Sequence, residues 1–180
     1  SERPLKMRPA ISPVASRPST ARSAISASAR TSASGSVKLS PFFSSLPHFV
    51  KRLEAVGADG VSLFNRFFQP DIDLDGLQMV EQLHLSSPEE ALLRIRWIAI
   101  LRAHTRMTLA ATGGVYGADD ALKLLLAGAD AVHLASALLE HGPGRLAQIL
   151  QDMKSWMIER EYESVAQLKG SMCQTNLRDA

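Results

Sequence analysis

From Val37 onward the sequence alternates between short apolar runs and longer amphipathic segments, and this alternation limits the fold more than any other feature. The apolar runs lack polar alternation, which is typical of strands buried on both faces of a parallel sheet. We predict strands at 37–39, 60–64, 107–111 and 131–134, each followed by a helix. Four strand–helix units in a row predict an α/β fold with a parallel sheet.

The helical segments carry recognisable boundary residues. The first covers 46–56 and stops at Gly57. The second starts at Ser87–Glu90, where a serine can cap, a proline fits the first turn and acids suit the positive end of the helix dipole. The third covers 118–127 and ends at Gly128, the expected glycine after a helix. These signals support the strand–helix order.

Three further segments complete the expected secondary structure. The second helix is expected to bury an apolar stripe, and the region from 66 to 86 is expected to be a long polar loop. A last amphipathic helix follows Gly142–Gly144. The expected stripe of the second helix contains Leu92, Ile95, Ile98, Ala99 and Ala103, and that of the last helix contains Leu146, Ile149, Leu150, Met153 and Met157.

Residues 1–36 differ in composition from the remainder. They consist mainly of Ser, Ala, Arg and Pro, with Glu2 as the only acid, and cannot bury enough apolar surface to offset chain entropy. We expect a disordered or non-native low-complexity segment here. A disordered tail, a transit peptide and a frame error or truncation are the three explanations of its origin.

Size, charge and cysteine content exclude several classes of protein. A net charge of +2 gives no reason to expect nucleic-acid binding, and the lone Cys173 excludes an internal disulfide. No apolar run reaches the roughly 18 residues of a membrane span. We therefore expect a soluble, cytoplasmic chain without a metal site. Its 180 residues are too few for a complete (β/α)₈ barrel, which needs roughly 250.

Two loops at consecutive strand ends have the composition of phosphate-binding turns. Thr112, Gly113 and Gly114 follow the third strand, and Ala135 and Ser136 follow the fourth. Small residues allow backbone N–H groups to approach an anion closely. Barrels frequently bind phosphate after strands 7 and 8. Residues 37–180 therefore fit the C-terminal half of a (β/α)₈ barrel, although a glycine pair alone also suits an ordinary turn.

Two polar residues fall at the same predicted rim. Lys38 lies in an otherwise apolar strand, where a lysine is costly unless it is paired or functional. Asn65 ends the second strand. An edge-strand lysine in solvent and a turn-forming asparagine are the structural alternatives. The convergence of both with the two loops indicates a binding site.

Five motifs together resemble the dihydroorotate dehydrogenase-like proteins, which are FMN enzymes with a (β/α)₈ fold. The resemblance covers 37–180 and is clearest to the bacterial dihydroorotate dehydrogenase-like branch. It implies flavin-dependent oxidation of dihydroorotate or a related dihydropyrimidine in pyrimidine biosynthesis. The motifs are Val37-Lys38-Leu39-Ser40-Pro41, Gly57-Ala58-Asp59-Gly60, Leu63-Phe64-Asn65-Arg66-Phe67, Ala111-Thr112-Gly113-Gly114-Val115 and Gly128-Ala129-Asp130.

The resemblance also implies roles for individual residues. Lys38 matches a catalytic lysine beside the flavin ring, where a cation stabilises the reduced cofactor. Asn65 matches an asparagine that hydrogen-bonds the substrate. The residues expected to hold FMN, besides Lys38, are Thr112, Gly113, Gly114, Ala135 and Ser136. Three residues depart from the family pattern, namely Ala111, Ala135 and Arg66.

The family's proton-abstracting Cys or Ser has no counterpart here. Cys173 is interpreted as a packing cysteine and His133 as a core histidine on a buried strand. We therefore expect an incomplete FMN enzyme. A non-flavin barrel that binds a phosphorylated substrate and an inactive fragment are the alternatives. Half a barrel has two open sheet edges and is expected to be unstable or to self-associate through them.

Overall fold

The computed structural model describes residues 35–66, 70–81 and 84–176, all within one compact unit, Ser32–Ala180. The segment predicted to be disordered is 1–36; residues 1–34 of it fall outside the described residues, and Ser36 is the first residue of β1. Four parallel strands form a sheet in the order β1-β2-β5-β6. They are β1 (Ser36–Leu39), β2 (Gly60–Leu63), β5 (Thr108–Thr112) and β6 (Ala131–His133).

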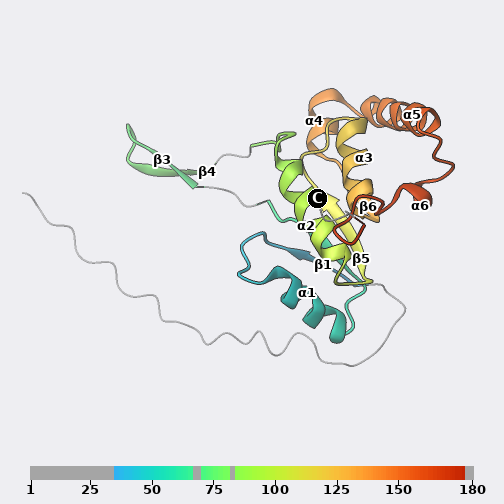
Figure 1. The fold of residues 1–180 in the computed structure, drawn as a ribbon. Coiled ribbons are helices and arrows are strands. Elements are labelled where there is room, and N and C mark those ends of the chain that lie inside the picture. The colour runs from blue at the N-terminus through green and yellow to red at the C-terminus, as the bar shows by residue number, and fades with distance from the viewer. Residues whose placement is uncertain (1–34, 67–69, 82–83, 177–180) are drawn as a thin grey trace, which may run out of the picture. The chain divides into compact units, whose positions relative to one another are not determined.

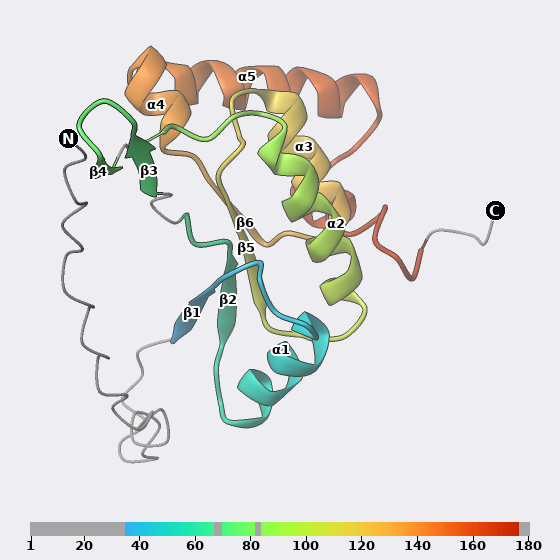
Figure 2. The ribbon, with the colours of Figure 1, turned by 90° about the vertical axis from the view of Figure 1, so that its left-hand side faces the viewer.

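The connecting helices confirm the predicted strand–helix order. Helices α1, α2 and α3 pack together on one face of the sheet (Figures 1 and 2). Strands that follow one another in this sheet are neighbours in space, as expected of successive parallel βαβ units. The helices are α1 (Leu46–Ala55), α2 (Glu90–Arg102), α3 (Ala118–Ala127), α4 (Ser136–His141), α5 (Gly144–Glu159) and α6 (Val165–Leu168).

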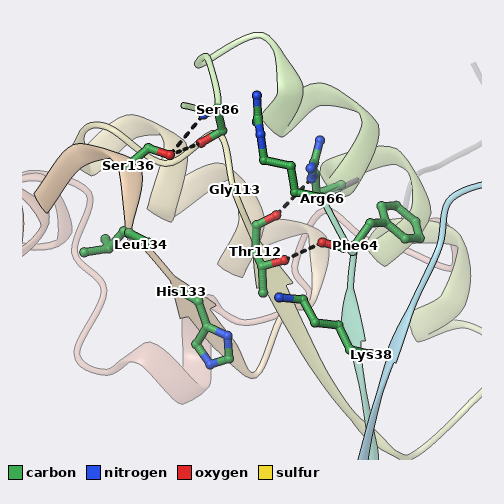
Figure 3. A pocket seen from close by; sticks show the side chains of 11 residues that line it. Lys38, Phe64, Arg66, Ser86, Thr112, Gly113, His133, Leu134 and Ser136 are labelled. Carbon is green, nitrogen blue, oxygen red and sulfur yellow. Dashed lines mark hydrogen bonds between the residues drawn. The ribbon is translucent and has the colours of Figure 1, made fainter. Parts of the chain in front are cut away.

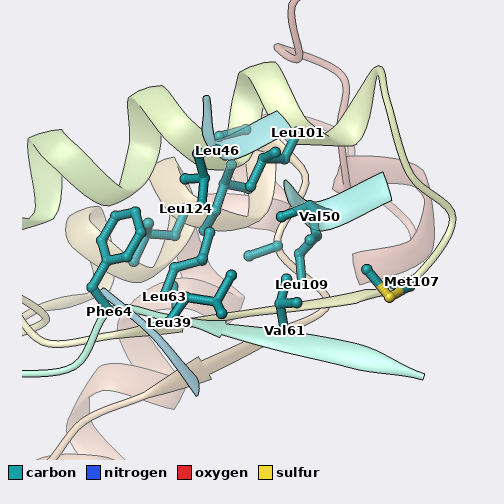
Figure 4. Close-up of a cluster of buried hydrophobic side chains, with 14 of the residues drawn as sticks. Leu39, Leu46, Val50, Val61, Leu63, Phe64, Leu101, Met107, Leu109 and Leu124 are labelled. Atoms are coloured by element: carbon teal, nitrogen blue, oxygen red, sulfur yellow. The ribbon is translucent and has the colours of Figure 1, made fainter. Parts of the chain in front are cut away.

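The core lies between the sheet and these three helices. All four residues of β2 are buried, as its apolar sequence predicted. Each leucine that is fully buried here stabilises the fold by about 1.5–3 kcal/mol through removal of apolar surface from water. Figure 4 shows leucines of the strands beside leucines of the helices, and the buried leucines of this cluster are Leu39, Leu46, Leu63, Leu101, Leu109 and Leu124.

The buried face of α2 differs in part from the predicted stripe. Ile98 is buried, and Ile95 and Ala99 pack against the core, as predicted. Leu92 is exposed, however, and the buried residues Ala91, Arg94 and Leu101 lie outside the predicted stripe. The helix is apolar around much of its circumference, so periodicity alone did not identify the whole of the face that packs. Its start also differs, because no side chain caps it and it begins at Glu90.

The segment predicted as a long polar loop contains an antiparallel hairpin. Strands β3 (Pro70–Asp73) and β4 (Gln78–Glu81) pair in register, with Ile72 opposite Met79. This corrects the prediction. The alternation of acidic and apolar residues in Asp71–Asp73 is the period-two signal of a strand, which the surrounding polar residues obscured.

Asp130 anchors the amino-terminal end of β6. One carboxylate oxygen accepts from the Leu109 amide at 2.8 Å and pairs with Arg102, and the other pairs with Lys169 at 2.7 Å. Gly128 precedes it with φ +116°, and a Cβ there would lie 2.8 Å from the Cγ of Arg102. The predicted glycine at the end of α3 is thus confirmed, with close packing as an additional reason for it.

Candidate functional site

The carboxyl ends of the four strands meet at one edge of the sheet and surround a pocket. The register places Leu39 beside Leu63 and Thr112 beside His133, so the residues after each strand converge. Figure 3 shows the pocket with side chains from all four strand ends. Its lining residues are Lys38, Phe64, Arg66, Ser86, Arg94, Thr112, Gly113, His133, Leu134, Ala135 and Ser136.

Five of the seven residues predicted from sequence line this pocket. They are Lys38, Thr112, Gly113, Ala135 and Ser136. Lys38 is exposed on β1, and its ammonium group is directed toward Thr112 (Figure 3). Asn65 lies just outside the lining: its amide donates to Leu39 O at 2.6 Å, and its side chain lies 3.5 Å from Lys38 O.

The two glycines after β5 have different surroundings. Gly114 donates its N–H to the hydroxyl of Ser86 at 3.1 Å, and a Cβ at Gly114 would lie 2.4 Å from the amide nitrogen of Ala91. A glycine is required at this position because the first turn of α2 packs directly against its Cα. Gly113, in contrast, belongs to the pocket lining, and a Cβ there would lie 3.3 Å from the Nη2 of Arg94.

Ser86 connects the loops that follow β5 and β6. Its N–H and its hydroxyl lie 3.0 and 2.8 Å from the hydroxyl of Ser136, and its carbonyl accepts from the Tyr116 hydroxyl at 2.6 Å. Together with the bond from Gly114, these contacts hold the two predicted phosphate loops side by side. Sequence reasoning considered neither Ser86 nor this connection, because the partners are up to 50 residues apart.

An ion-pair network of Arg66, Glu90 and Arg94 borders the pocket and was also missed. Glu90 pairs with Arg66 at 2.6 Å and with Arg94 at 3.2 Å. Burial raises the pKa of Glu90, but the hydrogen bond from Arg66 and the two positive charges outweigh it and hold that pKa below its ordinary value. The Glu90 carboxylate therefore stays ionised and fixes both guanidinium groups.

His133 is exposed and lines the pocket, so its interpretation as a core histidine is wrong. It ends β6, one of the two edge strands of the four-stranded sheet, and this strand pairs with β5 alone. Cys173 is buried, with its sulfur 3.1 Å from the Thr175 hydroxyl, as expected of a packing cysteine.

Two properties of the described residues bear on metal ions and membranes. No three His, Cys, Asp or Glu side chains in this part of the chain are grouped so that they could bind a metal ion. Among the same residues, no helix combines the length and the apolar character needed to cross a bilayer.

The sequence matches the dihydroorotate dehydrogenase family model over residues 14–157. The match begins before Val37, where we expected no resemblance, and this corrects the expected start. The catalytic subunit of dihydroorotate dehydrogenase B (NAD(+)) from Trichlorobacter lovleyi is 29% identical over 139 residues, which is 76% of this chain and 45% of that protein. The same subunit from Listeria innocua is 32% identical over 136 residues, covering 74% and 44%.

A solved structure is similar as well. The ligand-free DHODH from Eimeria tenella superposes with a TM-score of 0.62 at 18% identity, covering 75% of this chain and 39% of that one. This likeness confirms the predicted α/β fold with the parallel sheet of a partial (β/α)₈ barrel. The chain spans less than half the length of the curated relatives it matches. The family model and the relatives together show that this chain belongs to the dihydroorotate dehydrogenase family.

Proposed function

We propose that this chain forms the cofactor-binding part of an FMN-dependent oxidoreductase that oxidises dihydroorotate or a related dihydropyrimidine in pyrimidine biosynthesis. The observation that carries the proposal is the convergence of Lys38, Gly113 and the Ala135–Ser136 loop on one pocket in a chain of this family. A pocket at the carboxyl ends of parallel strands is where barrel enzymes bind their ligands.

The residues present fit a phosphate group. Gly113 lines the pocket without a side chain to obstruct an anion, and the Ala135–Ser136 loop is held beside this turn through Ser86. Thr112 completes the lining, with its hydroxyl donating to Phe64 O at 2.9 Å. Gly114 takes a supporting role, since its amide is already bound to Ser86. Preorganised N–H groups of this kind bind anions without much rearrangement.

Lys38 and Asn65 are assigned to the reacting end of the site. When bound, FMN supplies hydride acceptance, and Lys38 stabilises the negative charge that the reduced flavin carries. Asn65 orients the pyrimidine through its side-chain amide. Its weak 3.5 Å contact with the Lys38 carbonyl leaves that amide available for a substrate.

No base is assigned within this chain. Among the described residues, Cys173 is buried outside the pocket lining, and the Ser86 and Ser136 hydroxyls are hydrogen-bonded to each other. We assign proton abstraction to the remainder of a complete barrel. The edges of β1 and β6 are the surfaces through which that remainder, or a second copy of the chain, completes the sheet. We place the protein in the cytoplasm.

The proposal is tested by expressing the chain with excess riboflavin in the medium and recording its visible spectrum after purification. We expect the visible absorption bands of oxidised flavin, and we expect denaturation of the protein to release FMN. Colourless protein contradicts the proposal. If borohydride instead reduced an imine between Lys38 and an aldehyde substrate to a stable adduct, that result would favour a non-flavin barrel enzyme.

A further inference from the structure

Arg94 is a buried arginine with incomplete internal pairing. Its side chain is 7% exposed, and burial lowers its pKa, an effect that Glu90 opposes. Its Nε donates to Thr112 O at 3.0 Å, and its Nη1 donates to Glu90 O at 2.8 Å. Its Nη2 lies 3.2 Å from Glu90 Oε2. Burial of a charge costs desolvation free energy unless the charge is paired and hydrogen-bonded, and these contacts offset much of that free energy.

The guanidinium still has donors outside these contacts. Arginine carries five N–H groups, and the contacts just described engage three of them. Nη2 lies 3.3 Å from the position that a Cβ would take at Gly113, and Arg94 is among the lining residues. The absence of a side chain at Gly113 therefore leaves the guanidinium open toward the pocket.

The charges around the pocket suit a dianion. Its described lining contains the cations Lys38, Arg66 and Arg94 and no acidic side chain. The nearest carboxylate in the network is that of Glu90, which pairs with both arginines. Three cations and one carboxylate leave two positive charges, the complement of a doubly ionised phosphate monoester.

We propose that Arg94 determines the preference of this pocket for a phosphate monoester, because it fixes the Thr112–Gly113 turn and directs its remaining donors at the same anion. The identity of that ester as FMN rests on the proposed function. Neither the sequence motifs nor the two glycines account for this role. It arises from the packing of α2 against the turn after β5.

The test compares binding of FMN with binding of riboflavin, which lacks the phosphate, by isothermal titration calorimetry. Arg94→Met removes the charge, and Arg94→Lys keeps a charge but cannot reach both Thr112 O and Glu90. Arg96→Met is the matched control, because Arg96 lies exposed on the same helix and forms no ion pair within the described residues. Inorganic phosphate is titrated as a separate ligand with each variant.

We expect Arg94→Met to weaken FMN binding by roughly tenfold or more while riboflavin binding changes little, because a charge-assisted hydrogen bond is lost. The FMN affinity of Arg94→Lys should lie between those of Arg94→Met and the unmodified chain. The FMN affinity of Arg96→Met should equal that of the unmodified chain. The proposal would be overturned if Arg94→Met bound FMN as tightly as the unmodified chain does. It would also be overturned if Arg94→Met weakened the binding of FMN and riboflavin by the same factor.

Two further outcomes separate this proposal from the flavin function. A chain that binds inorganic phosphate but neither flavin overturns the FMN assignment, and the phosphate affinities of the Arg94 variants then decide the role of Arg94. A chain that binds none of the three ligands overturns both proposals. If Arg94→Met fails to fold, a wild-type-like affinity ratio of FMN to riboflavin in Arg94→Lys overturns the role of Arg94.

Discussion

The hydroxyl of Ser86 lies 2.8 Å from the hydroxyl of Ser136, and this contact joins the segment before α2 to the loop after β6. Because Ser86 also accepts from the Gly114 amide, one buried serine connects both predicted phosphate loops. The spacing of those loops therefore depends on a residue that belongs to neither of them.

Ser136→Ala is expected to destabilise the chain by about 1–2 kcal/mol, because the Ser86 amide loses its acceptor in a buried place. The free energy of unfolding from urea denaturation measures this. Ser155→Ala, on the exposed side of α5, is the control and should change that free energy by less than about 0.5 kcal/mol. An equal effect of both substitutions would contradict the proposed connection.

Gly113 and Gly114 are expected to respond differently to alanine. Gly114→Ala combines φ +79° with a 2.4 Å approach to the Ala91 backbone, so we expect a loss of stability of roughly 2–3 kcal/mol. Gly113→Ala meets the Arg94 side chain at 3.3 Å and the Cβ of Ser86 at 3.6 Å, with φ +85°, so it should cost less stability while weakening FMN binding more. Thermal unfolding and FMN titration of both variants check this order, and the reverse order would contradict it.

The sequence predicted the strand order well because apolar runs and glycine-terminated helices leave local signals. Burial was predicted correctly only for β2 and β5, because β1 and β6 lie at the edges of the sheet. The strand at 60–64 and the helix at 118–127 are examples of these local signals, and the rim residues followed from strand ends. Arg94 could not be found in this way, because its burial depends on which face of α2 meets the Thr112–Gly113 turn. Ser86 was missed because its hydrogen-bond partners, Ser136 and Gly114, lie far from it in the sequence.

Asp130 should make stability dependent on acid pH. Burial raises its pKa, but hydrogen bonds from Lys169 and Leu109 and the charge of Arg102 outweigh this and place it below its ordinary value of 3.8. A carboxyl group with a lowered pKa in the folded state stabilises the fold above its unfolded pKa, and this contribution disappears as the pH falls through the folded value.

Asp130→Asn should therefore lower the free energy of unfolding by about 2 kcal/mol at pH 7, and the difference from the unmodified chain should shrink below about pH 4. Urea denaturation at several pH values measures this difference. Asp152→Asn, on the exposed side of α5, should show no such trend. A difference for Asp130→Asn that stays constant from pH 7 to pH 3 would exclude this electrostatic explanation.

Lys38→Met tests the assignment of Lys38 to the flavin ring. Removal of a cation beside the reduced flavin should lower the midpoint potential of bound FMN by roughly tens of millivolts, with little change in stability at this exposed position. Lys51→Met, on the exposed side of α1, is the control. An unchanged potential in Lys38→Met, measured by redox titration, would place Lys38 away from the ring.

Amide NMR of the ¹⁵N-labelled chain tests whether the turn after β5 and the loop after β6 hold one phosphate group. Addition of FMN should shift the amide resonances of Gly113 and Ala135 strongly and that of Gly114 weakly, because Gly114 is bound to Ser86. Riboflavin should leave all three nearly unchanged. Shifts that are equal for FMN and riboflavin, or absent at Gly113 and Ala135, would contradict a phosphate site shared by the two loops.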